Sequence, residues 1–149
     1  MTSAADRIAA AVGQVMFKRD HAAHALGIEL IEIRPGYARM SMKVRPDMVN
    51  GHDICHGGLI FALADTAFAY ACNSGNKSTV AQSCVVTFLS AARTGDVLTA
   101  TATERNRTQR TGLTDIDVTD QSGKLIAVVR GHSHQIKGEV VPGLGSVER

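Results

Sequence analysis

One segment of this sequence, residues 59–72, is so apolar that it limits what the whole chain can fold into. It reads LIFALADTAFAYAC, in which only Asp65, Thr66 and Tyr70 are polar. This stretch predicts a helix over about residues 57–74, and no face of such a helix suits water. The rest of the chain must therefore enclose the helix on most sides.

Several β-rich segments are available to enclose it. Residues 28–44, IELIEIRPGYARMSMKV, predict two strands joined at Pro35-Gly36, the second of which alternates apolar and polar side chains. Further β-rich segments follow the helix at residues 79–91, 96–105, 112–120 and 124–136. Their short connections predict antiparallel neighbours. One sheet wrapped around one long central helix is the arrangement that hides the apolar run, so the predicted fold class is α+β.

The two ends of the chain have simpler predictions. Ser3 is placed to cap a first helix, and Asp20 to cap a short turn that stops at Gly27. The tail from Gly138, rich in glycine, is expected to be loose and flexible. A chain of 149 residues is large enough for one core, so residues 1–149 are expected to form a single domain.

Charge and cysteine content argue against several classes of protein. Sixteen basic and fourteen acidic side chains leave a formal charge of +2, which gives no field to recruit nucleic acid. The three cysteines form no CxxC pair, and an odd number does not suit a secreted disulfide framework. No signal peptide is recognisable, and the apolar run is too short to span a bilayer. We therefore expect a soluble, cytoplasmic protein with no membrane and no nucleic-acid partner.

The start of the predicted helix is the first candidate site. Gly57 and Gly58 follow His56 directly, and glycines there let a ligand approach backbone N–H groups that have no partner inside the helix. Together with the helix dipole, such donors stabilise an oxygen that gains negative charge during acyl transfer. The other interpretation is that the two glycines only allow tight packing between loop and helix.

Asp65 is the second candidate, because a buried carboxylate must either find partners or have a raised pKa. It lies eight residues beyond Gly57, about 12 Å along the helix axis, so the two groups cannot serve one substrate atom from the same helix. A twofold dimer resolves the distance, since the helix start of one subunit can approach the carboxylate of the other. Alternatively, Asp65 is a buried acid bonded to a serine or threonine hydroxyl.

Histidines and arginines raise two further possibilities. HDICH, residues 52–56, imitates the HExxH zinc motif, but the flanking glycines keep its two histidines off a helix face, so no metal site is expected. Surface or structural roles are expected for His21, His24, His132 and His134. A local basic cluster is formed by Arg93, Arg105, Arg107 and Arg110. This cluster is either a solvated turn or a site for phosphates, which guanidinium groups bind with two hydrogen bonds.

The stretch NGHDICHGGLIFALADTAFAYACNS, residues 50–74, resembles the PaaI-type acyl-CoA thioesterases of the hot-dog superfamily over its whole length. RTGLTDIDV and VVRGHSHQIKG resemble the C-terminal half of that family, so the resemblance covers about residues 20–138. It implies a hot-dog fold and hydrolysis of phenylacetyl- or hydroxyphenylacetyl-CoA without a cofactor. It also implies a homodimer that completes the active site, and a homotetramer built from two dimers.

The resemblance assigns roles to residues of both candidate sites. Asp65 would act as general base or nucleophile, and Gly57 would donate its N–H to the thioester carbonyl. Asn50 and His56 would orient the thioester and the water or leaving thiolate. The remaining polar contacts would come from Ser83, on the subunit that supplies Asp65, and from Thr66.

The same resemblance assigns the nucleotide and phosphates of CoA to the surface around the arginine cluster. It therefore favours the phosphate interpretation of that cluster over the solvated turn. The residues that it implies for CoA binding are Ser90, Arg93, Arg107, Thr108, Gln109, Arg110, Thr111 and Gly112.

Two other functions are compatible with these residues. A dehydratase or hydratase of the same fold abstracts a proton next to the thioester carbonyl and usually pairs an acid with a histidine, for which Asp65 and His56 would qualify. A CoA-ester binding protein without turnover is the other. The products separate them: hydrolysis releases a free thiol, hydration leaves the thioester with a double bond gained or lost, and binding alone changes neither.

Overall fold

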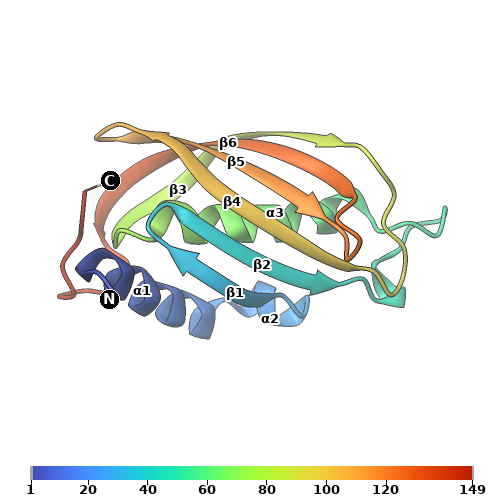
Figure 1. Ribbon diagram of the computed structural model, residues 1–149, viewed down its shortest axis with the longest axis horizontal. Coiled ribbons are helices and arrows are strands. Elements are labelled where there is room, and N and C mark those ends of the chain that lie inside the picture. Colours follow the sequence, from blue (N-terminus) through green and yellow to red (C-terminus); the bar gives the residue numbers. More distant parts are fainter. Residues whose placement is uncertain (1, 149) are drawn as a thin grey trace.

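The computed structural model describes residues 2–148, which form one antiparallel sheet that curves around a single long helix (Figure 1). The sheet has six strands in the order β1-β2-β4-β5-β6-β3, and every neighbouring pair is antiparallel. The strands are β1 Glu29–Arg34, β2 Tyr37–Lys43, β3 Lys77–Phe88, β4 Val97–Arg107, β5 Thr111–Thr119 and β6 Leu125–Glu139. The predicted α+β class is confirmed.

The enclosed helix, α3, covers Gly57–Asn73 and contacts every strand of the sheet. Leu63, Ala67 and Phe68 on this helix are almost completely buried. The alternating side chains of β2 face them, since Ala38, Met40 and Met42 are buried as predicted. Removal of these apolar side chains from water is the main stabilising term of the fold. The predicted central helix is confirmed, one residue shorter at its end.

The other helices lie on the N-terminal part of the chain: α1 Ala4–Arg19, α2 His21–Ala25 and a short 3₁₀ helix, Pro46–Met48. Both predicted caps are present. The Ser3 hydroxyl accepts from the Asp6 N–H at 3.0 Å, and Asp20 Oδ1 accepts from the Ala23 N–H at 3.2 Å. No helix within residues 2–148 is long and apolar enough to cross a membrane.

The predicted neighbour of β3 is wrong. β3 pairs with β6 and not with β4, the strand that follows it in the sequence. Residues 89–96 cross the end of the sheet instead, where the Leu89 N–H donates to the Ile126 carbonyl at 2.8 Å. The crossing segment also covers the start of α3, because the Cys55 N–H donates to the Ala92 carbonyl at 2.7 Å. The crossover therefore lies beside the candidate site.

The C-terminal segment, which is expected to be loose, makes hydrogen bonds to the rest of the fold. β6 continues to Glu139, past Gly138. Asn76 is buried and has a positive φ of 68°, and its Nδ2 donates to the carbonyls of Val141 at 3.1 Å and Gly145 at 2.8 Å. These bonds hold the tail against the loop after α3, at the same end of the molecule as the N-terminus (Figure 1).

Candidate active site

The start of α3 carries a backbone donor that no other described group uses. His56 is the N-cap residue: its Nδ1 accepts from the Gly58 N–H at 3.0 Å, and its carbonyl accepts from the N–H groups of Leu59 and Ile60. Within residues 2–148, the N–H of Gly57 has no acceptor. It is therefore free, at the positive end of α3, to bind an oxygen that gains negative charge.

A cavity of about 360 Å³ opens beside this donor. Three predicted site residues lie in its wall: Asn50, Gly57 and Ser90. The rest of the wall is apolar and consists of Ile54, Cys55, Ile60, Phe88, Leu89, Ala91 and Ala92. Ser90 reaches the helix start because the crossover after β3 passes it. The cavity suits an apolar group attached to a carbonyl that binds at Gly57.

The loop before α3 orients two polar side chains. Asn50 Oδ1 accepts from the His52 N–H at 2.9 Å, which leaves the Asn50 amide NH₂ without an acceptor in the described chain. Because His56 Nδ1 is an acceptor, a neutral His56 ring carries its proton on Nε2. Both side chains can therefore donate a hydrogen bond to a ligand. No three His, Cys, Asp or Glu side chains in residues 2–148 lie close enough together to hold a metal ion.

Phe88 provides a packing reason for a glycine at position 57. A Cβ atom on Gly57 would lie 2.9 Å from Cζ of Phe88, closer than real carbon contacts. Phe88 is the last residue of β3, and its ring lies beside the helix start, where it forms one wall of the cavity. The residue is 52% exposed. The tight-packing interpretation of this glycine and the donor interpretation are therefore compatible, and Gly57 meets both requirements.

Asp65 is partly buried on α3, and this burial raises the pKa of its carboxyl group. The side chain makes no hydrogen bond within residues 2–148. The hydroxyl of the adjacent Thr66 donates instead to the Ala62 carbonyl at 2.7 Å. This chain therefore does not pair Asp65 with a serine or threonine hydroxyl. A carboxylate with a raised pKa and no partner is the pattern expected of a general base.

The strand beside Asp65 presents Cys84 rather than Ser83. Cys84 packs against the core, and burial, followed by the charge of Asp65, raises the pKa of its thiol. Side chains alternate along a strand, so Ser83 faces outward together with Val85, which is 70% exposed. A bulge between Ala81 and Ser83 sets this alternation. Within residues 2–148 Ser83 makes no hydrogen bond to Asp65, and Cys84, which the motif did not single out, lies beside the carboxylate.

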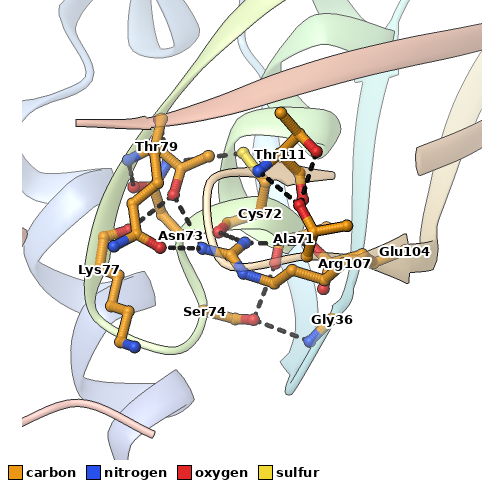
Figure 2. Close-up of polar contacts among 12 residues, drawn as sticks. Gly36, Ala71, Cys72, Asn73, Ser74, Lys77, Thr79, Glu104, Arg107 and Thr111 are labelled. Carbon is orange, nitrogen blue, oxygen red and sulfur yellow. Dashed lines mark hydrogen bonds and ion pairs between the residues drawn. The ribbon is translucent and has the colours of Figure 1, made fainter. Parts of the chain in front are cut away.

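The arginine cluster divides into exposed and buried members. The exposed ones, with their neighbours in the β4–β5 turn, are Arg93, Arg105, Thr108, Gln109, Arg110 and Thr111. The Arg107 side chain is only 8% exposed and is surrounded by internal partners (Figure 2). Gly112 is buried, and a Cβ atom there would lie 2.6 Å from Ser133 Oγ. Arg107 and Gly112 are thus packed inside the fold, unlike the exposed residues that the resemblance implies for the phosphates.

One chain does not bring the two principal groups together. Gly57 and Asp65 belong to the same helix and are separated by about 12 Å along its axis. β3 lies at the end of the strand order, so its outer edge has no strand partner in residues 2–148. An unpaired edge is a surface where a second strand can add.

The sheet wrapped around α3, with a free donor at the helix start, defines the hot-dog class of thioesterase folds. The model of the thioesterase superfamily matches residues 52–127, and the chain belongs to this family. The predicted fold and the predicted enzyme class, a hydrolase of thioester bonds, are confirmed at the level of the family.

Individual relatives confirm the resemblance to PaaI-type enzymes. The acyl-coenzyme A thioesterase PaaI of Escherichia coli (strain K12) is 47% identical over 125 residues, which cover 84% of this chain and 89% of that protein. A putative esterase of Archaeoglobus fulgidus is 35% identical over 88% of this chain and 85% of its own length. The solved structure of the E. coli PaaI protein matches with a TM-score of 0.89 and 45% identity, covering 90% of this chain and 97% of that one.

Proposed function

We propose that this protein hydrolyses acyl-CoA thioesters to a free acid and CoA, with phenylacetyl- or hydroxyphenylacetyl-CoA as the preferred substrate. The observation that carries the proposal is the presence of two unused groups on α3, the N–H of Gly57 and the carboxyl of Asp65. The N–H suits the developing oxyanion, and a carboxylate with a raised pKa suits activation of water. The named acyl-coenzyme A thioesterases among the relatives support it.

Two copies of the chain complete each site. In a twofold dimer with antiparallel α3 helices, Gly57 of one subunit lies level with the partner subunit's Asp65, which gives two equivalent sites. The unpaired edge of β3 supports such an assembly. We further propose that two dimers form a homotetramer and that the protein works in the cytoplasm.

The reaction follows from these two groups. The thioester carbonyl oxygen accepts a hydrogen bond from the Gly57 N–H. The partner subunit's Asp65 takes a proton from water, which attacks the carbonyl carbon; in the alternative, its carboxylate attacks directly and water later hydrolyses the anhydride. In the general-base route, the tetrahedral intermediate collapses and expels the CoA thiolate, which takes up the proton that the partner subunit's Asp65 removed from water. The Nε2–H of His56 and the amide of Asn50 orient the thioester and the thiolate.

The CoA moiety binds across the two subunits. At the register that sets Gly57 against the partner subunit's Asp65, the C-terminal end of α3 extends beyond the start of the partner's α3. The β4–β5 turn lies at this end of α3, so it approaches the partner's crossover segment with Ser90 and Arg93. Exposed Arg110 and Arg93 then supply guanidinium groups to the phosphates, one from each subunit.

The acyl group binds in the cavity beside Gly57. Its wall contains no charged side chain, and Ile60, Phe88 and Leu89 are among its apolar residues. The Phe88 ring can pack edge-to-face or offset against an aromatic acyl group. This lining supports the preference for an arylacetyl group over a polar one.

Thiol release from phenylacetyl-CoA, measured beside a panel of straight-chain acyl-CoA esters, tests the proposal. The wild type should release thiol, fastest with the arylacetyl ester. Asp65→Asn should lose about a hundredfold or more in kcat while it still binds the substrate. Binding without thiol release would identify a binding protein, and an intact thioester with a changed double bond would identify a dehydratase or hydratase.

A further inference from the structure

We propose that Arg107 is a positioning residue that fixes α3 along its axis and so sets the distance between Asp65 and the partner subunit's Gly57. The inference rests on the proposed function. In this inference Arg107 does not bind CoA. It affects turnover instead by holding α3, a role that its position in the arginine cluster does not indicate. Figure 2 shows the side chain among the residues that end α3.

The guanidinium group of Arg107 joins four elements. Nη1 donates to the Cys72 carbonyl in the last turn of α3 at 3.1 Å and to the carboxylate of Glu104, on the same strand, at 3.3 Å. Nη2 donates to Thr79 Oγ1 on β3 at 3.3 Å and to Gln135 Oε1 on β6 at 3.1 Å. The side chains of Arg107 and Glu104 are 8% and 5% exposed, so water and salt screen these contacts little.

The residues after Cys72 strengthen this attachment. Asn73 donates from Nδ2 to the Thr79 carbonyl and accepts from the Thr79 N–H, each at 2.9 Å. The Ser74 hydroxyl donates to the Ala71 carbonyl and accepts from the Gly36 N–H, each at 2.8 Å (Figure 2). The end of α3 is therefore bound to β3 and to the β1–β2 turn. The start of α3 is capped by the exposed His56 side chain and held by backbone bonds from Cys55 to Ala92 and from His56 to Met48. The C-terminal end adds buried side-chain bonds to three further segments, so Arg107 is one of the groups that restrain α3 along its axis.

Twofold symmetry doubles any displacement of α3. Antiparallel helices related by a twofold axis slide in opposite directions, so a shift of each by about 0.5 Å changes the offset between Asp65 and the partner's Gly57 by about 1 Å. A misplacement of about 1 Å at a reacting centre costs about a hundredfold in rate. Cys72 lies about two turns from Asp65 on the same rigid helix. A shift of α3 on loss of the Arg107 contact would therefore move the carboxylate of Asp65 by a similar distance.

Arg107→Lys tests this role. Lysine keeps the charge beside Glu104, but a single ammonium group cannot reach Cys72, Thr79 and Gln135 together. We expect kcat to fall about tenfold or more, the KM for the acyl-CoA and inhibition by free CoA to stay within about twofold, and the acid limb of the pH profile of kcat/KM to shift. Arg130→Lys is the matched control, because Arg130 forms an ion pair with Asp115 on the exposed face of the sheet. Its kcat should not change.

A second variant keeps the test valid if Arg107→Lys folds poorly. Glu104→Gln combined with Arg107→Gln removes both charges and leaves no unpaired buried carboxylate. It should show the same fall in kcat with unchanged inhibition by free CoA. Weaker inhibition by CoA with normal kcat would overturn the inference and return Arg107 to the CoA site. A lower unfolding temperature with unchanged kcat, KM and pH profile would also overturn it. Absence of thiol release by the wild type would instead refute the proposed function.

Discussion

Gly57 is a position where a backbone donor can be removed without removing a helix. It is the first residue of α3, where proline is tolerated because the N–H has no partner in the helix. His56 before it has φ −60° and ψ 131°, a conformation that suits the residue before a proline. Gly57→Pro should therefore lower kcat about a hundredfold or more, measured by thiol release at saturating acyl-CoA.

Gly57→Ala is the control for this change, since it keeps the N–H but adds a Cβ atom, as proline does. Both variants must displace the ring of Phe88, which is half exposed and can move. Circular dichroism should show the same helix content in both. Equal losses of activity in the two variants would assign the effect to Phe88 and show that Gly57 is not the oxyanion donor.

Asp65 lowers the stability of the fold at neutral pH. Burial raises its pKa in the folded protein, so the folded state holds the proton more tightly than the unfolded state does. The stabilisation that comes from this tighter proton binding is fully present below the unfolded pKa of about 3.9. It is lost as the pH rises through the pKa of the folded protein. Asp65→Asn should therefore unfold at a higher temperature than the wild type at pH 8, with a smaller difference at pH 4. A less stable Asn variant at pH 8 would contradict an unpartnered, buried carboxylate.

At the scale of elements, local chemistry was enough to predict most helices and strands. The caps at Ser3 and Asp20 and the uniformly apolar α3 each carry their signal in a few adjacent residues. The place of β3 beside β6 was not predictable, because it depends on a crossover that passes the enclosed helix. No residue in the sequence indicates the bulge before Ser83. The position of Cys84 near Asp65 was therefore not predicted. Likewise, the spacing of the arginines does not indicate that Arg107 forms a buried ion pair with Glu104.

The contact between Tyr70 and Asp20 joins α2 to α3. Tyr70 is buried, and its hydroxyl donates to Asp20 Oδ2 at 3.1 Å, while the other oxygen of Asp20 caps α2. Burial, followed by the charge of Asp20, raises the pKa of Tyr70, so the phenol stays a donor at all working pH values. Tyr70→Phe should lower the free energy of unfolding by about 1 kcal/mol, measured by urea denaturation. No coupling in a double-mutant cycle with Asp20→Ala would contradict this link.

At the scale of the whole molecule, the two ends of α3 differ in what they do. The end at Asn73 is tied to several strands, whereas the start at Gly57 has a free donor and an open cavity. The sequence was enough to predict that one chain separates this donor from Asp65, because the helical rise is fixed. It gave no indication of the surfaces that meet, since strand edges exist only in the folded sheet. Under the proposed function, a second copy would complete the chemistry rather than add stability alone.

A site shared between subunits predicts that two inactive variants rescue each other. Gly57→Pro lacks the donor but keeps Asp65, and Asp65→Asn lacks the base but keeps the donor. In a mixed dimer one site receives both defects and the other receives neither. With equal amounts and random exchange, half of the dimers are mixed and one of their two sites is intact, so about a quarter of the wild-type kcat should return. Thiol release after co-expression, or after dissociation and reassociation, measures this. Each variant carried through the same procedure alone is the control, and no gain on mixing would place both groups of a site in one chain.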